Sequence, residues 1–146
     1  GHQVTVLPIA QGDRAIAGDF DKIVIGASIR YGKHSPLVFD FVHRHQAALD
    51  KVPSAFFTVN VVARKPEKNT PDTNPYMVKF LKKVAWKPTR LGVFAGKIDY
   101  PRLGSGDRMI IRFIMWMTKG PTDPTGTFEF TDWKKVEAFA EVVSTM

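Results

Sequence analysis

The sequence predicts an α/β fold, in which helices cover both faces of a doubly wound parallel sheet. Short apolar, β-branched runs such as Lys22–Ile25 alternate along the chain with amphipathic segments of helical period. Two of these segments begin with a capping residue followed by proline, at Ser35-Pro36 and Asn74-Pro75. Small residues follow the strand at Gly26-Ala27-Ser28. Such a strand-to-loop transition is typical of ligand sites in open α/β sheets.

The length of 146 residues predicts one domain over 1–146. Hydrophobic residues form 44% of the chain, which is enough for a packed core. The absence of cysteine excludes disulfides, thiolate catalysis and cysteine-ligated metals. The formal charge of +7 favours anionic partners such as phosphates, carboxylates or lipid headgroups. No apolar run reaches the ~20 residues of a membrane-spanning helix.

In the first half of the chain we expect three strands and one helix. Val4–Leu7 is predicted to be a strand, followed by a loop over 8–18 and a second strand over Asp21–Ile25. The helix capped by Ser35 should bury one stripe, formed by Leu37, Val38, Phe41, Val42 and Leu49. Ser54–Val62 is mostly apolar and long enough to be a central strand.

The second half continues the alternation and then interrupts it. The helix capped by Asn74 should bury Met77, Phe80, Leu81 and Val84, and Leu91–Ala95 should be the fourth strand. An insert is predicted over 100–126, where proline, glycine and an apolar block break the pattern. Thr127–Thr131 alternates like a strand, and Asp132 should cap a last helix that buries Trp133, Val136, Ala140 and Val143.

Three loops should meet at one rim of this sheet: Ser28–Gly32, Asn60–Lys65 and Ala95–Lys97. Tyr31 could stack on a planar ring, and the side-chain amide of Asn60 could both donate and accept hydrogen bonds. Spacing alone favours a plainer interpretation, with an ordinary turn carrying an exposed tyrosine and a solvated basic loop.

Longer stretches of the chain resemble a known family. IVIGASIRYGKH, PSAFFTVNVVARKPEKNTP, the turn at Tyr100-Pro101-Arg102 and TDW at 131–133 are similar to the flavodoxin-like, quinone-dependent protoporphyrinogen oxidases of haem biosynthesis. The resemblance covers nearly the whole chain. It implies a long-chain flavodoxin-like fold whose last strand is split by the insert into Leu91–Asp99 and Thr127–Thr131.

The sequence departs from that family at its beginning. The family starts with a strand and a Ser/Thr-rich phosphate loop, and neither is found in this sequence. In the flavodoxin strand order 2-1-3-4-5 the first strand is central. We therefore expect Val4–Leu7 and Lys22–Ile25 each to leave an inner edge unpaired, and residues 1–146 to bind a flavin phosphate weakly.

The resemblance also implies an activity, which is the FMN-dependent oxidation of protoporphyrinogen IX to protoporphyrin IX with menaquinone or another quinone as electron acceptor. No amino-acid side chain accepts hydride, so the flavin would carry the chemistry. The alternative is a flavodoxin-like electron-transfer or docking protein without a porphyrin substrate. Arg64, Lys65 and Arg102 would bind the substrate carboxylates. The implied flavin contacts are Ser28, Ile29, Arg30, Tyr31, Gly32, Asn60, Val61, Val62, Ala63, Arg64 and Gly96.

The block 108–117 is unusually apolar, since eight of its ten residues are large and hydrophobic. As a helix it would be about 15 Å long at ~1.5 Å per residue, which is too short to cross a bilayer. We expect peripheral contact with a membrane, with the arginines reaching headgroups and Trp116 at the boundary. The protein would then be cytoplasmic and peripheral on the inner or an organellar membrane. A core helix or a subunit interface in an oligomer is the alternative.

Two other kinds of partner are not expected. Eight Lys or Arg residues lie between Arg64 and Arg90, against two acids, but no stacking platform accompanies them, so nucleic acid is a poor match. His43 and His45 should point to different faces of one helix, so we expect no metal site. His34 flanks a helix and is expected at the surface.

Overall fold

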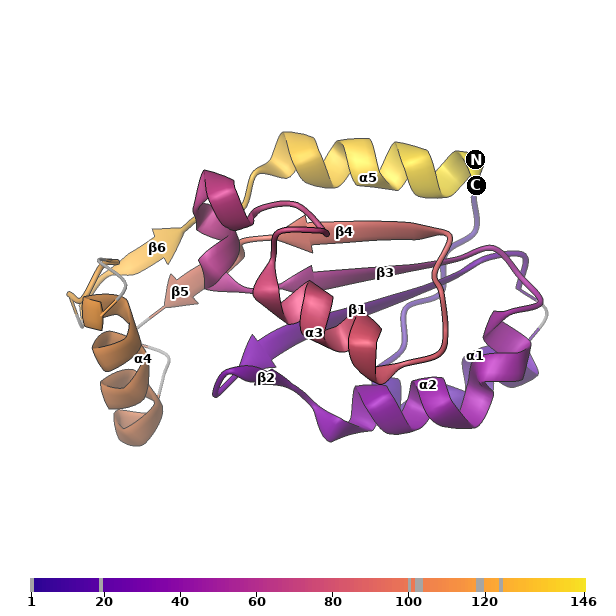
Figure 1. Cartoon of the computed structure of the whole chain (residues 1–146), viewed down its shortest axis with the longest axis horizontal. Coiled ribbons are helices and arrows are strands. Elements are labelled where there is room, and N and C mark those ends of the chain that lie inside the picture. The colour runs from indigo at the N-terminus through magenta and orange to yellow at the C-terminus, as the bar shows by residue number, and fades with distance from the viewer. Residues whose placement is uncertain (1, 19, 100, 102–103, 118–119, 124) are drawn as a thin grey trace.

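A four-stranded, mostly parallel sheet forms the centre of the computed structural model, which describes residues 2–18, 20–99, 101, 104–117, 120–123 and 125–146. The strand order is β2-β1-β3-β4, and β1 (Ile23–Arg30), β3 (Ser54–Val59) and β4 (Arg90–Phe94) run parallel (Figure 1). The short β2 (Lys33–His34) pairs antiparallel with the last two residues of β1. The predicted α/β fold with a mostly parallel sheet is confirmed.

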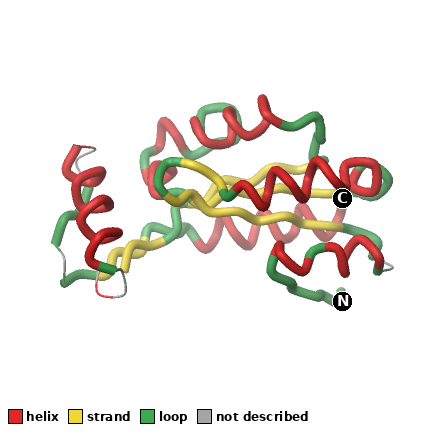
Figure 2. The backbone as a smooth tube through the Cα atoms, turned by 90° about the horizontal axis from the view of Figure 1, so that it is seen from below, coloured by secondary structure: helices red, strands yellow, loops and turns green. Residues whose placement is uncertain are grey.

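Helices cover both faces of this sheet, as predicted. α2 (Pro36–Leu49) and α3 (Pro75–Lys83) lie on one face, and α5 (Trp133–Thr145) lies on the other (Figures 1 and 2). Successive residues of β3 serve the two faces in turn, because side chains alternate along a strand. Phe56 stacks on Phe80 of α3 at 3.9 Å between ring centroids, whereas Phe57 meets Phe139 of α5 edge-on at 6.0 Å.

All three predicted helix caps are present. The Ser35 hydroxyl accepts a hydrogen bond from the backbone N–H of Leu37, and the Asn74 side-chain oxygen accepts from Tyr76 and Met77. The Asp132 carboxylate accepts from the N–H groups of Lys134 and Lys135 at the start of α5. These local bonds satisfy donors that the first helical turn leaves free, which explains why the sequence pattern located the helix starts correctly.

The buried faces of two helices differ from the predicted ones. Leu37 is 54% exposed and Trp133 is 62% exposed, and Ala140 is exposed as well. The predictions for Val38, Phe41, Val42 and Leu49 on α2, and for Met77, Phe80 and Val84 around α3, are confirmed. On α5 the contact with the sheet is made instead by Phe139, which meets both Phe57 and Phe94. Val136 and Val143 are half-buried, so the predicted stripe is right at these two positions and wrong at Trp133 and Ala140.

The prediction of a strand at Val4–Leu7 is wrong. This segment has no regular structure, and Val4 and Val6 are 77% and 87% exposed. Over 23–28 the outer edge of β1 carries no strand within the described part of the chain. A cavity of about 150 Å³ separates Thr5 and Leu7 from that edge. A strand needs a neighbour for its N–H and C=O groups, and residues 4–7 find none.

Short helices and a longer strand replace other predicted loops. η1 (Ile9–Gln11) and α1 (Asp13–Ala17) lie where a loop over 8–18 was expected. β1 continues through Gly26-Ala27-Ser28 to Arg30, because these residues pair in parallel with β3 as far as Val59. β3 ends at Val59, earlier than predicted, and is followed by the 3-10 helices η2 (Val61–Arg64) and η3 (Pro66–Lys68).

The remaining elements form a small unit beyond the carboxyl end of the sheet (Figure 1). β5 (Lys97–Asp99) and β6 (Thr127–Glu129) pair antiparallel with each other, and α4 (Ser105–Met117) lies between them in sequence. β6 therefore joins β5 in a second sheet instead of extending the main one. Ile98 and Met115 are the buried centre of this unit, which we call the α4 unit. None of the helices described here is long and apolar enough to cross a membrane.

Candidate functional site

The carboxyl ends of β1, β3 and β4 meet at one rim of the sheet, as expected for parallel neighbours. Three segments follow these ends: the turn at Tyr31-Gly32, the helix η2 after Asn60, and the bend at Ala95-Gly96. The sequence grouped these segments correctly, although it treated residues 26–28 as loop. The rim is therefore the place where residues from three strands can contact one ligand.

The turn at Tyr31-Gly32 has an unusual backbone. Its φ angles are +53° at Tyr31 and +76° at Gly32, and Arg30 pairs with Lys33 across it. Two residues with positive φ are typical of a tight hairpin turn, but a tyrosine in this conformation is uncommon. The Tyr31 side chain is 49% exposed, and nothing lies within 4 Å of the position that a Cβ would take on Gly32. Strained, exposed aromatic residues of this kind are often found at ligand sites.

The bend after β4 requires glycine. Gly96 has a φ of +70°, and a Cβ there would lie 2.7 Å from Cγ1 of Val59. No other residue could keep the backbone of this bend so close to the end of β3. Two glycine positions at the rim therefore carry no side chain, one beside open space and one beside the end of β3.

Asn60 differs from the expectation that its side chain faces a ligand. It is 4% exposed, and its side-chain oxygen accepts hydrogen bonds from Ala63 N–H and from Asn74. Its amide nitrogen donates to the side-chain oxygens of Thr58 and Asn74. All of its capacity is thus used inside the protein. Its contribution to the rim is to fix the backbone of η2, which carries Val61, Val62, Ala63 and Arg64.

His34 is a buried residue, contrary to the prediction that it lies at the surface. It is 5% exposed, and Nε2 lies 2.8 Å from the Thr58 hydroxyl. The rings of Phe39, Phe56 and Phe80 surround it. Burial, followed by the positive charge of Lys83, lowers the pKa of His34 to about 4, so the ring is neutral at physiological pH. Little in the sequence indicated this burial beyond the position of His34, two residues after the Tyr31-Gly32 turn.

Two arginines of the rim, Arg30 and Arg64, contact the α4 unit or the residues next to it. Arg30 forms an ion pair of 2.8 Å with Asp107 in the first turn of α4, and its guanidinium lies 5.4 Å from the Tyr31 ring centroid. Arg64 donates to the carbonyl of Val61 and lies over the Phe130 ring at 6.0 Å. Lys65 is half-buried beside it, and Arg102 lies outside the described residues. Arg30 and Arg64 therefore connect the rim to the insert.

α4 presents two different faces. Met115 is 3% exposed and packs with the half-buried Ile111 against Ile98. The opposite side is apolar but open to solvent, with exposures between 59% and 73% for Met109, Phe113, Trp116 and Met117. The exposed Arg112 donates from Nε to the carbonyl of Thr122. The exposed apolar residues are spaced as on one side of a helix.

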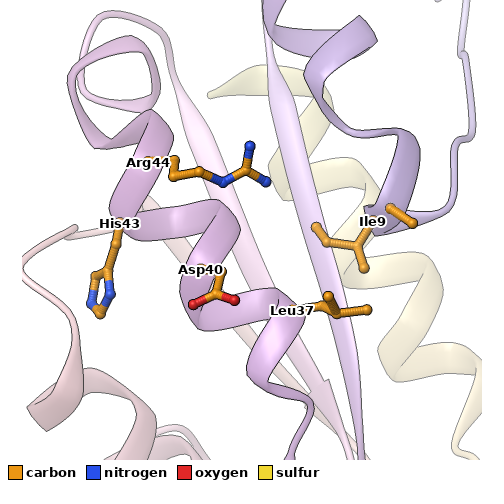
Figure 3. A pocket seen from close by; sticks show the side chains of 6 residues that line it. Ile9, Leu37, Asp40, His43 and Arg44 are labelled. Atoms are coloured by element: carbon orange, nitrogen blue, oxygen red, sulfur yellow. The ribbon is translucent and has the colours of Figure 1, made fainter.

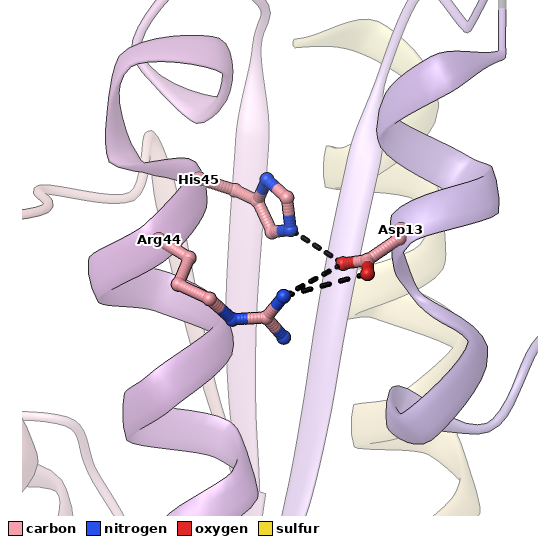
Figure 4. Close-up of polar contacts among 3 residues, drawn as sticks. All are labelled: Asp13, Arg44 and His45. Atoms are coloured by element: carbon pink, nitrogen blue, oxygen red, sulfur yellow. Dashed lines mark hydrogen bonds and ion pairs between the residues drawn. The ribbon is translucent and has the colours of Figure 1, made fainter.

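Two polar features lie away from the rim. A cavity of about 460 Å³ is lined by η1 and α2 only, with Ile9, Ala10, Leu37, Asp40, His43 and Arg44 around it (Figure 3). Arg44 and His45 both reach Asp13 of α1, at 3.2 and 2.6 Å (Figure 4). The hydrogen bond from His45, followed by the charge of Arg44, holds the pKa of Asp13 below its usual value. This cluster joins α1 to α2.

Among the residues that the structure describes, no three His, Asp or Glu side chains are grouped closely enough to hold a metal ion. The rim instead suits an aromatic ligand. It offers an exposed tyrosine ring, two glycine positions and several backbone groups, which are the features that hold a flavin ring in an open α/β sheet.

Comparison with known proteins identifies the family of the chain. Residues 1–125 match the family of flavodoxin domains. The chain is 46% identical over 135 residues to "Protoporphyrinogen IX dehydrogenase [quinone]" of Leishmania major, covering 92% of this chain and 58% of that protein. It is 47% identical over 126 residues to the protein of the same name from Escherichia coli strain K12, covering 86% of this chain and 70% of that protein. No solved structure matches the chain significantly.

Proposed function

This chain belongs to the flavodoxin-domain family, in the group with the relatives named protoporphyrinogen IX dehydrogenase [quinone], and from that membership we propose that it is an FMN-dependent oxidoreductase. It oxidises protoporphyrinogen IX to protoporphyrin IX and passes the electrons to a quinone. The substrate and acceptor are taken from the names of the relatives. The observation that carries the proposal is the rim, where Tyr31, Gly32 and Gly96 leave an exposed aromatic ring beside closely approaching backbone.

The residues of the rim have distinct tasks. A bound flavin supplies the hydride acceptor that no side chain can provide. Tyr31 and the turn from Ser28 through Ile29 and Arg30 to Gly32 would contact the ring from one side. The backbone of Val61, Val62, Ala63 and Arg64 would contact it from the next strand, held in place by Asn60. Gly96 would permit close approach from the third strand.

Charged residues near the rim would orient the substrate. Protoporphyrinogen carries carboxylate arms. Lys65, directly after η2, is better suited to meet one than Arg64, which is packed against Phe130. Arg102 keeps its proposed role without a structural argument, because it lies outside the described residues. Arg30 at the rim forms an ion pair with Asp107 of α4, so a substrate at the rim would also lie close to α4.

We further propose that the exposed face of α4 binds the membrane surface, where a lipid-dissolved quinone is available. Four large apolar side chains point away from the protein, and the cationic Arg108 and Arg112 belong to the same helix. An amphipathic helix with this composition lies in the interface and is attracted to anionic lipids. The protein would be cytoplasmic and peripheral on the inner or an organellar membrane.

Absorption spectroscopy of the purified protein tests the cofactor. Added FMN should show shifted visible bands, and Tyr31→Ala should reduce the shift at equal protein concentration. The matched control is Tyr76→Ala, because Tyr76 is half-buried on α3 and is not among the proposed flavin contacts. FAD or riboflavin binding more tightly than FMN would contradict the choice of cofactor.

The alternative is an electron carrier that binds flavin but no porphyrin substrate. The exposed face of α4 and the basic residues of the rim favour the oxidase, since a carrier needs neither. The two functions separate when protoporphyrin formation is measured directly, because a carrier would show a flavin spectrum without producing protoporphyrin.

A further inference from the structure

A second cavity, of about 210 Å³, is lined by the segment from Gly32 to His34 and by residues of α2 and α3. Its lining includes three lysines and one acid: Lys33, Lys79, Lys83 and Asp40. Gly32 belongs both to the wall of this cavity and to the proposed flavin contacts. The cavity is thus cationic and adjoins the rim.

The floor of the cavity is aromatic. Phe39 and Phe80 line it, with their ring centroids 5.4 Å apart, and Nζ of Lys83 lies 5.3 Å from the Phe39 centroid. Phe80 is fully buried and His34 nearly so. An apolar floor lowers the local dielectric constant, which strengthens the attraction between an anion and the lysines at the mouth.

A chain of buried hydrogen bonds fixes the tautomer of His34. Asn74 accepts from the backbone of α3 through Oδ1, so its amide nitrogen must donate to Oδ1 of Asn60. Asn60 also accepts from Ala63 N–H through Oδ1, so its own nitrogen donates to the Thr58 hydroxyl. The Thr58 proton then has one acceptor among its partners, which is Nε2 of His34 at 2.8 Å. His34 therefore carries its proton on Nδ1.

The Nδ1–H group of His34 reaches the cavity. It makes no hydrogen bond with any residue that the structure describes, yet within those residues no buried side-chain nitrogen or oxygen lacks a partner. Nδ1 must therefore be accessible, and the cavity that His34 lines gives that access. Since burial keeps the pKa of His34 low, the group is a neutral donor. A neutral N–H donor beside three ammonium groups matches a carboxylate oxygen.

We propose that this cavity is a carboxylate subsite that takes one propionate arm of the tetrapyrrole substrate, while the macrocycle lies over the rim beside Tyr31. The subsite rests on the proposed function. The volume is below the ~300–1,000 Å³ of pockets that enclose whole ligands, so an arm fits and a macrocycle does not. A second arm is left for Lys65.

The test compares protoporphyrin IX with its dimethyl ester, which has the same macrocycle but no free carboxylate. Affinities are measured by fluorescence for the wild-type protein, for Lys79→Ala with Lys83→Ala, and for Lys82→Ala with Lys87→Ala. The last pair removes the same charge from exposed lysines that do not line the cavity. We expect the first pair to weaken binding of the diacid roughly fivefold to tenfold, and the control pair and the ester to show little change.

A histidine readout locates the effect. Binding of the diacid should raise the pH at which the His34 ring titrates in NMR spectra, because a carboxylate beside the ring favours its protonated form. Equal loss of diacid affinity in both lysine pairs, or equal affinity of the wild-type protein for diacid and ester, would overturn the subsite. Succinate binding as tightly as the diacid would assign the cavity to small free acids, which also overturns it.

The proposed function has a separate readout. Oxidation of protoporphyrinogen is measured in the wild-type protein and in both lysine pairs. If both double-lysine variants turn over the substrate with the same KM, the subsite is rejected, but the proposed oxidase function still stands. Absence of turnover in the wild-type protein rejects the function, whatever the lysine pairs show.

Discussion

The sheet and the α4 unit place their large apolar side chains in opposite ways. In the core around the sheet, Phe56 of β3, Phe80 of α3 and Trp86 of the following loop are almost completely buried, and the indole N–H of Trp86 donates to Ser54. Among the α4-unit residues whose side chains the structure describes, Ile98 and Met115 are buried, while Phe113 and Trp116 face solvent. The same residue types thus stabilise the fold in one region and remain available for binding in the other.

The difference shows why the block 108–117 could not be interpreted from composition alone. Apolar residues at helical spacing are found both in cores and on docking helices. In the structure Met115 and Ile111 pack against the protein. The exposed residues of the helix are Met109, Phe113, Trp116 and Met117. Substitutions in the two regions should therefore differ in their effects on stability and on binding.

The largest effect is expected from removing a core ring. Phe80→Ala should lower the free energy of unfolding by roughly 3–5 kcal/mol, because it leaves a cavity below Phe56 and His34. Phe113→Ala is the matched substitution in the α4 unit, and it should change stability by less than about 0.5 kcal/mol. Chemical denaturation measures both. Similar losses for the two variants would show that the α4 face is part of the folded core.

Much of the fold around the sheet could be predicted because the sequence signals that mark its helices act locally. The caps at Ser35, Asn74 and Asp132 act on the next turn of their own helices, and the structure has all three. The strand at Val4–Leu7 was predicted wrongly, since a strand exists only beside a neighbour. The apolar pattern of residues 4–7 does not show whether a partner strand lies beside them.

The site was predictable to a lesser degree for a related reason. Its three segments were found because parallel strands bring their carboxyl ends together. The burial of His34 and Asn60 depends on packing between β3, α2 and α3, which leaves no periodic signal. The pairing of Arg30 with Asp107 joins residues 77 positions apart and could not be inferred from spacing.

The next largest effect concerns membrane binding. Phe113→Asp with Trp116→Asp should abolish co-sedimentation with anionic vesicles and leave the melting temperature within a few degrees, since both side chains are exposed. Trp133→Asp is the control, because Trp133 is a similarly exposed tryptophan on α5. Loss of vesicle binding in the control as well would contradict a role specific to α4. A collapse of the melting temperature in the double variant would show that this face is covered by protein.

A moderate effect is expected from pH, and it should arise in the sheet. The pKa of His34 falls from 6.5 to about 4 on folding, so between these values the unfolded chain binds a proton that the folded chain does not. Stability from this group is therefore complete above pH 6.5 and decreases as the pH falls toward 4. The slope would be at most about 1.4 kcal/mol per pH unit.

Denaturation at several pH values measures this dependence. His34→Gln should flatten the curve between pH 6.5 and 4. His43→Gln should not, because His43 is exposed on α2. An unchanged slope in His34→Gln would show that another group is responsible, and that the assignment of His34 as a buried neutral ring is incorrect.

The smallest effect is expected at the connection between the two regions. Arg30 and Asp107 form an ion pair whose arginine is 74% exposed, so the interaction should contribute less than about 1 kcal/mol to stability. A double-mutant cycle with Arg30→Ala and Asp107→Asn measures it by denaturation. A coupling free energy above 2 kcal/mol would mean that this pair holds the α4 unit rigidly against the sheet.

The most direct test of the account is the formation of protoporphyrin by the purified protein. Protoporphyrinogen IX is supplied under anaerobic conditions with saturating FMN, and product fluorescence is followed with and without a menaquinone analogue. We expect product to exceed the amount that the supplied FMN alone could oxidise only when the quinone is present as well, because the quinone must reoxidise the flavin for repeated turnover. A flavin spectrum perturbed by the protein, together with no protoporphyrin above the protein-free rate, would contradict the oxidase and identify an electron carrier.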